Sequence, residues 1–320
     1  MSDESPSTSL SRPPTAFEVR LDRAFQGLTR VVAWLAIGLV FLIVFQIAWT
    51  ARPAVETYGL DFLTSSSWNP SGKKFGILPQ IGGTLFSSIL GVSIGSVFGI
   101  AVAIFITQNF LPPKLEIFIK NVVELLAAIP SVVYGLWGIF VVIPTLRPLC
   151  NGLHESLSFI PLFSTRLAGP GMLPASLVLA IMVLPTVTAI SRDAIVAVPP
   201  KLRDAAFGLG ATLWETIMAI ILPTASRGIF GSIILAFGRA VGETMALAML
   251  LGNSNTLSWS LFAPGNTLAA LLANQWPESG QAEKGALMYA GLVLLAITLI
   301  INIIGTLILQ RTVSSGDAHR

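Results

Sequence analysis

Residues 285–310, GALMYAGLVLLAITLIINIIGTLILQ, contain no charged side chain over 26 positions. About 20 such residues are enough for a helix to cross the hydrocarbon core of a bilayer. The whole chain has this character, since 53% of its 320 residues are hydrophobic and only 11% are charged. A soluble domain usually carries about 25% charge, so the composition predicts a membrane protein. It excludes a soluble enzyme, a disordered chain and a collagen.

Five other apolar stretches reach the length of a span. The longest, 75–113, is rich in glycine and has prolines at both edges, so we expect one helix in it. The stretch 228–252 also qualifies, although it carries Arg239 and Glu243 near its middle. The sequence therefore predicts an all-α polytopic fold with six transmembrane helices, at about 31–51, 80–108, 125–146, 170–191, 228–252 and 285–310.

The distribution of lysine and arginine predicts the orientation of the chain. Twelve of these residues lie before the first span, in the turn 111–124, in the loop 192–227 and after the last span, against six in the loops between. Positive residues favour the cytoplasmic side, so the termini, 1–29 and 311–320, are expected in the cytoplasm. Residues 1–16 are rich in Ser, Thr and Pro and predict a flexible tail. They do not fit a signal peptide, because no short apolar core with a small-residue cleavage site follows.

The loop 192–227 is longer than a simple connector between helices. Its pattern predicts two short helices, the first opened by a proline pair and ended by glycines that include Gly210. Thr212 and Glu215 stand in the register of a capping box and predict the start of the second helix, which we expect Pro223 to stop. Apolar side chains near the turn, such as Leu209, predict a docking surface on the cytoplasmic side.

Two other local patterns concern packing. Gly91, Gly95 and Gly99 recur every four residues and favour a close helix contact, either within this chain or with a partner. Pro130 is expected to kink the third span and free backbone carbonyls near a cavity. Tyr134 is expected to be a packing or interface residue.

Catalytic and metal-binding patterns are absent from the sequence. It has no GxxxxGK motif followed by Ser or Thr, so it has no phosphate-binding loop of an ATPase. His154 and Glu155 do not start a metalloprotease motif, because Ser158 stands where the second histidine is needed. One cysteine and two histidines leave almost no ligands for a metal, and no basic run indicates nucleic acid binding. We therefore predict no catalytic residue, no metal site and no nucleic acid partner.

One motif consists of Asp204-Ala205-Ala206, Gly210, and then Ile220, Leu222 and Pro223. It resembles the motif of the membrane subunits of bacterial ABC importers, in which glutamate is usual at the position of Asp204. The resemblance implies a type I importer permease (MetI-like) fold in the inner membrane, with coupling helices that sit in a groove of a separate ATPase. It also implies that this chain binds no cofactor, and that ATP and Mg are used by the partner ATPase. The coupling residues that the resemblance implies are Asp204, Ala205, Ala206, Gly210, Leu222 and Pro223.

Further segments are similar to a permease subunit of the phosphate importer. They are Phe62-Leu63-Thr64, Trp68-Asn69-Pro70, Phe75-Gly76 with Pro79, then 123–138 and 238–244, in that order. The resemblance implies import of inorganic phosphate. It also implies a homologous second permease, two copies of the ATPase and a periplasmic phosphate-binding protein as partners.

Arg239 and Glu243 form the predicted substrate pathway. Four residues apart on one helix, they are expected to lie on the same face within reach of each other. A charge near the bilayer centre costs about 2.5–3.5 kcal/mol, so such residues usually face a functional cavity. One interpretation is an ion pair that serves assembly. The interpretation we favour is an anion pathway, in which Arg239 donates to a phosphate oxygen and Glu243 restrains the empty arginine.

Three other functions remain open at this point. Two of these alternatives belong to the same class: a permease for another oxyanion, and the second permease of the phosphate importer. In a different class, the chain is a self-sufficient channel or an ion-coupled carrier, which would have no use for the loop 192–227.

Overall fold

The computed structural model describes residues 15–108 and 110–317, with side chains up to residue 310. The predicted flexible tail lies outside the described residues up to position 14, as do residues 318–320 of the C-terminus. The chain divides into two compact units, Met1–Trp49 and Thr50–Arg320, each of which is described by itself.

The first unit consists of the greater part of α1 (Ala16–Tyr58). Thr15 and Glu18 exchange hydrogen bonds at its start, since each backbone N–H is donated to the other side chain, at 2.7 and 3.3 Å. This reciprocal pair satisfies two N–H groups that have no partner within a helix. The helix therefore begins well before the expected span at 31–51.

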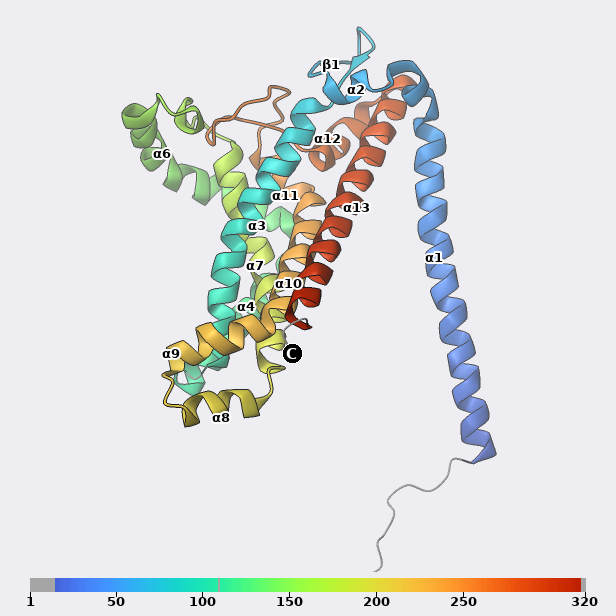
Figure 1. Cartoon of the computed structure of the whole chain (residues 1–320). Helices are drawn as coiled ribbons and strands as arrows, with labels where there is room; N and C mark the ends of the chain where they lie inside the picture. The colour runs from blue at the N-terminus through green and yellow to red at the C-terminus, as the bar shows by residue number, and fades with distance from the viewer. Residues whose placement is uncertain (1–14, 109, 318–320) are drawn as a thin grey trace, which may run out of the picture. The chain divides into compact units, whose positions relative to one another are not determined.

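The second unit is also helical apart from one small antiparallel hairpin, which pairs Trp68 with Phe75 and Asn69 with Lys74. Its helices α3, α7, α10 and α13 run side by side, with α8 and α9 at one end and the hairpin with α2 at the other (Figure 1). The elements are α2 (Asp61–Thr64), β1 (Trp68–Asn69), β2 (Lys74–Phe75), α3 (Leu78–Thr107), α4 (Pro113–Ala128), α5 (Ser131–Trp137), α6 (Ile143–Leu157), α7 (Met172–Val196), α8 (Pro200–Gly208), α9 (Leu213–Thr216), α10 (Leu222–Val241), α11 (Met245–Leu250), α12 (Leu268–Gln275) and α13 (Gln281–Asp317).

Six helices in the described part of the chain are long and apolar enough to cross a membrane. They are Ala16–Tyr58, Leu78–Thr107, Ser131–Leu157, Met172–Val196, Leu213–Val241 and Gln281–Gln310. Two of them include a π-helical turn, Gly138–Val142 between α5 and α6 and Ile217–Ile221 between α9 and α10. Where the bilayer surfaces cross each helix stays a prediction.

The three glycines of α3 pack against α7, within this chain. A Cβ on Gly95 would lie 2.6 Å from a methyl carbon of Val183 and 2.7 Å from the carbonyl oxygen of Ala180. Gly91 and Gly99 meet α7 in the same way, one turn before and one turn after. The contact that the sequence left open between this chain and a partner is therefore internal, and α7 with α3 forms the centre of the subunit.

Gly95→Val is expected to destabilise the folded chain by about 1–3 kcal/mol, because the added methyl groups would collide with the backbone of α7. The matched control is Gly231→Val in α10, where an added Cβ meets nothing within 4 Å. Thermal unfolding of the full chain in detergent compares the two. Equal stability of both variants would contradict the packing described.

Pro223 does not end a short helix, contrary to the sequence-based expectation. The π-helical turn Ile217–Ile221 ends two residues before Pro223, and α9 continues through this turn into α10. A proline lacks the N–H that an α-helix needs and its ring crowds the preceding turn. The wider turn accommodates both defects, so one helix runs from Leu213 to Val241.

Pro130 has a larger effect than the expected kink, because the chain breaks there. Ile129 and Pro130 are both extended, with ψ of 128° and 143°, and they separate α4 from α5. The residue before a proline avoids the helical region, which explains the break at this point. The third span therefore begins at Ser131, and α4 is a separate helix before it.

Candidate functional site

The fifth span breaks a few residues after Arg239. The helix ends at Val241, and α11 starts at Met245 after the three residues 242–244. The stretch is apolar on both sides, so the expected helix over 228–252 is wrong in its second half. Non-helical backbone at membrane depth is tolerated only where it is buried in protein or lines a water-filled cavity.

Local hydrogen bonds satisfy part of the backbone at this break. The hydroxyl of Thr244 donates to the carbonyl of Gly242 at 3.1 Å, and the N–H of Glu243 donates to the carbonyl of Ala240 at 3.2 Å. The carboxylate of Glu243 accepts from the N–H of Ala246 at 3.3 Å. Glu243 therefore stabilises the start of α11.

The expected contact between Arg239 and Glu243 is wrong. No ion pair in the described part of the chain includes either residue, and the side chain of Arg239 forms no hydrogen bond there. The spacing of four residues aligns two side chains only on a continuous helix, and this helix ends between them. Arg239 is exposed on the surface of the subunit.

A hollow of about 460 Å³ opens beside the break. It extends from Gly242 and Thr244 to α12 and α13, so the break has open space on one side. Its lining residues are Gly242, Thr244, Ala269, Leu272, Ala273, Trp276, Pro277, Met288 and Leu294.

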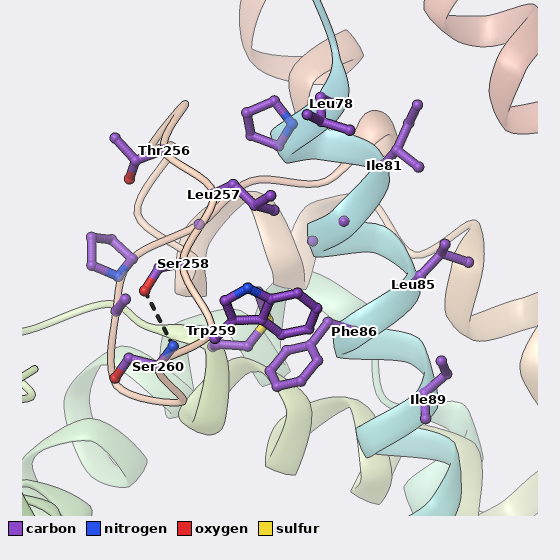
Figure 2. Close-up of a pocket in the computed structure, with 17 residues that line it drawn as sticks. Leu78, Ile81, Leu85, Phe86, Ile89, Thr256, Leu257, Ser258, Trp259 and Ser260 are labelled. Atoms are coloured by element: carbon purple, nitrogen blue, oxygen red, sulfur yellow. Dashed lines mark hydrogen bonds between the residues drawn. The ribbon is translucent and has the colours of Figure 1, made fainter. Parts of the chain in front are cut away.

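A second hollow, of about 320 Å³, lies between α3 and the segment 256–265 (Figure 2). Leu257, Trp259 and Phe86 face it, and no charged residue lines it. The N–H of Ser260 donates to the hydroxyl of Ser258 at 3.2 Å. This hollow is apolar and offers no positive charge to an anion.

The loop 192–227 has the predicted turn between its two helices. Gly210 has φ of +85°, which an L-residue with a side chain rarely adopts, and it turns the chain from α8 toward α9. The predicted capping box is confirmed, since Thr212 and Glu215 exchange hydrogen bonds. Leu209 is 90% exposed at the tip of this turn.

The predicted coupling residues differ in how much of each is exposed to solvent. Asp204, Ala205 and Gly210 are exposed beside Leu209, whereas Ala206 is 3% exposed. Leu222 packs against the cluster around Ile195, Ile217 and Ile221, and Pro223 is exposed on the continuous helix. Trp214 and Met218, which the sequence-based inference did not single out, are also exposed and lie four residues apart at the start of the following helix. Their spacing of four residues was the available signal.

Metal ligands do not gather in the described residues, where no group of three or more His, Cys, Asp or Glu side chains could hold an ion. Nδ1–H of His154 donates a hydrogen bond to the backbone carbonyl of Phe163 at 2.7 Å. Cys150 is buried.

Residues 91–314 match the family of binding-protein-dependent transport system inner membrane components. A protein of Mesorhizobium japonicum named phosphate transport system permease protein PstC is 39% identical, over 96% of this chain and 95% of its own length. A PstC protein of Xylella fastidiosa is 38% identical over 92% of both chains. A probable PstC protein of Methanocaldococcus jannaschii is 35% identical over 88% of this chain and 93% of its own. The chain belongs to the PstC family.

Solved structures confirm the MetI-like fold of this PstC-family chain. The permease of a bacterial alginate ABC transporter superposes with a TM-score of 0.61 and 17% identity, over 89% of this chain and 94% of its own. A chain of an inward-facing MetNI methionine ABC transporter superposes with a TM-score of 0.56 and 18% identity, over 74% of this chain and 95% of its own. These similarities show the fold alone.

Membership in the PstC family makes the chain a non-catalytic, multi-pass inner-membrane permease subunit of an ABC importer. Such an importer also has an ATPase and a periplasmic binding protein. The sequence left open a self-sufficient channel or an ion-coupled carrier. Membership in this family of ABC importer permeases speaks against both alternatives.

Proposed function

We propose that this chain passes inorganic phosphate into the cytoplasm as one of two permease subunits of an ATP-driven importer. Its relatives are named as phosphate transport permeases. The observation that carries the proposal is Arg239, an exposed arginine without an ion pair in the described residues. It lies in an apolar segment, two residues before α10 ends at Val241.

Arg239 would recognise the anion directly. Its guanidinium is a planar fork of N–H donors that matches two phosphate oxygens, and its charge is permanent. Since no carboxylate in the described chain neutralises it, an arriving anion would supply the missing counter-charge. Glu243 lies on the other side of Gly242 and would accept a hydrogen bond from the protonated oxygen of phosphate. Sulfate has lost that proton at neutral pH, so Glu243 would repel it.

The turn between α8 and α9 would couple the path to ATP hydrolysis. Its exposed residues, Asp204, Ala205, Leu209 and Gly210, would sit in a groove of the ATPase. One helix runs from Leu213 to Val241, so movement of the docked end would reach the residues beside the break. A helix of this length spans about 44 Å, more than the hydrocarbon core.

The proposed complex contains a PstA-like second permease, a PstB-like ATPase dimer and a PstS-like periplasmic phosphate-binding protein. ATP and Mg are bound by the ATPase, and this chain binds no cofactor of its own. The end with α8 and α9 is cytoplasmic, together with both termini, because twelve of the lysines and arginines fall on that side.

Uptake of labelled phosphate in cells lacking only this gene tests the function. We expect ATP-dependent phosphate uptake at low concentration to be lost and sulfate uptake to remain, and the intact gene to restore it. A loss of sulfate uptake with phosphate unaffected would assign the chain to another oxyanion and contradict the proposal.

A further inference from the structure

Tyr134 bridges the other break in the chain, at Ile129 and Pro130. Its hydroxyl, on the first turns of α5, donates to the carbonyl of Leu126 in the last turn of α4 at 2.8 Å. The last carbonyls of a helix have no partner within it, and an unsatisfied carbonyl is costly in an apolar surrounding. The hydroxyl therefore fixes the angle between α4 and α5.

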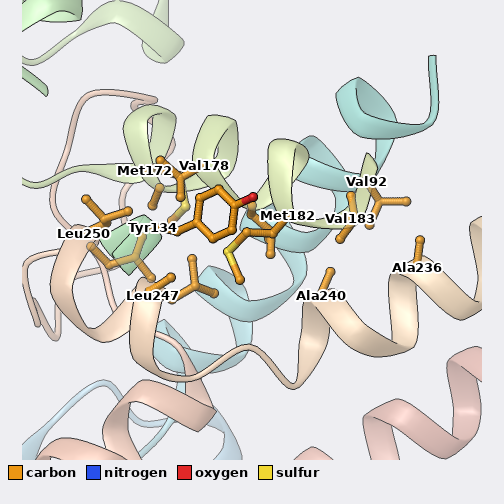
Figure 3. Packing of buried hydrophobic residues seen from close by; sticks show 14 of the residues in the cluster. Val92, Tyr134, Met172, Val178, Met182, Val183, Ala236, Ala240, Leu247 and Leu250 are labelled. Carbon is orange, nitrogen blue, oxygen red and sulfur yellow. The ribbon is translucent and has the colours of Figure 1, made fainter. Parts of the chain in front are cut away.

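The aromatic ring of Tyr134 lies in the main hydrophobic core of the subunit. It is 5% exposed and belongs to a cluster with Met182 of α7, Ala240 of α10 and Leu247 of α11. Figure 3 shows the ring in the middle of this cluster, near Met182 and Leu247. Ala240 directly follows Arg239, and Leu247 lies in the helix that begins after the break at 242–244. One core therefore contains Tyr134 and both sides of the second break.

The helices α5 and α11 are in direct contact beside this ring. A Cβ on Gly135 would lie 2.7 Å from the sulfur of Met249 and 3.4 Å from the Cα of Ala246. A Cβ on Gly138 would lie 2.6 Å from a methyl carbon of Leu250. Because α11 packs this closely against Gly135 of α5 and against Gly138 of the π-helical turn that follows α5, a change in the direction of α5 would displace α11 and the residues that precede it.

We propose that Tyr134 is a positioning residue of the phosphate path: its hydroxyl holds the break at Pro130, and its ring transmits that position to Arg239 and to the break at Gly242. The inference rests on the proposed function, because it assigns the path to the second break. Tyr134 itself does not contact the substrate, so its effect is on the geometry of the residues that do.

The chain provides a matched control for removal of this hydroxyl. Tyr289 also donates to a backbone carbonyl, that of Gly59, at 3.1 Å, in a different cluster near the β1–β2 end. Tyr134→Phe and Tyr289→Phe each remove one oxygen and one hydrogen bond of the same kind. In the complete importer in vesicles, Tyr134→Phe is expected to lower phosphate uptake per assembled complex about tenfold, whereas Tyr289→Phe leaves it within about twofold.

A second measurement, independent of phosphate, follows the break directly. Thr244→Cys in a Cys150→Ala background places a thiol at the break, and its rate of labelling by a water-soluble maleimide is compared with and without ATP. We expect Tyr134→Phe to abolish the difference between the two states, and Tyr289→Phe to preserve it.

Two results would overturn the inference. One is unchanged labelling and unchanged uptake per complex in Tyr134→Phe, even if less complex assembles, since this would be a purely structural effect. The other is an equal response of both tyrosine variants. If the unmodified complex takes up no phosphate, the proposed function fails, and the labelling comparison still decides the role of Tyr134.

Discussion

Arg239→Ala is expected to lower ATP-driven phosphate uptake by at least about a hundredfold, without loss of the assembled complex. In the proposed path the guanidinium would donate two charge-assisted hydrogen bonds and supply the positive charge, and about 2.7 kcal/mol corresponds to this factor. The side chain is exposed in the subunit and makes no hydrogen bond in the described residues, so its removal breaks no hydrogen bond or ion pair there. Uptake in proteoliposomes, normalised to the amount of complex, measures the effect.

Arg227→Ala is the matched control for Arg239. It changes an exposed arginine of the same helix, twelve residues earlier, near the docking loop. We expect its uptake to remain within about threefold of the unmodified complex, in line with the small effects of most surface charges. Arg239→Lys should recover part of the activity, because it restores the charge without the planar fork. Normal uptake by Arg239→Ala would place the path elsewhere.

Leu209→Asp is expected to weaken binding of the ATPase by at least about thirtyfold. Leu209 is 90% exposed at the tip of the turn between α8 and α9, and a central apolar anchor of an interface is worth about 2 kcal/mol or more. The introduced carboxylate would also be buried without a partner in the groove. Titration of the purified ATPase against vesicles that contain the permeases measures the change.

Phe159→Asp is the control for this variant. Phe159 is 79% exposed, in the segment after α6, away from the docking turn. Its replacement introduces the same charge on an exposed apolar position, and we expect ATPase binding to be unchanged. A normal affinity of Leu209→Asp for the ATPase would show that the turn is not the docking surface.

The composition of the sequence was sufficient to predict six helices, but not where two of them break. Residues 245–250 are as apolar as the helix before them, and an apolar pattern does not distinguish one long helix from two short ones. Gly242 was the local signal, since glycine is common directly after a helix. Thr244 stands at the N-cap position of α11, but its side chain forms no capping hydrogen bond there. At Pro223 the opposite error occurred, because the π-helical turn that accommodates the proline has no recognised sequence pattern.

The identity of the site residues stays a prediction, and their arrangement differs from the expected one. Arg239 stood out because a charge in an apolar segment is costly, whatever its neighbours. Its relation to Glu243 depended on a helix that ends between the two residues. The role inferred for Tyr134 depends on the carbonyl of Leu126 and on the packing of α5 against α11, which only the folded chain brings together.

The most direct test of the account is phosphate accumulation by the reconstituted complex, with the loaded binding protein outside the vesicles and ATP inside. We predict accumulation of labelled phosphate that requires ATP hydrolysis, that is absent without this chain, and that is lost in Arg239→Ala while the complex remains intact. Accumulation without this chain, or equal accumulation with and without the arginine, would contradict the path assigned to the break at Gly242.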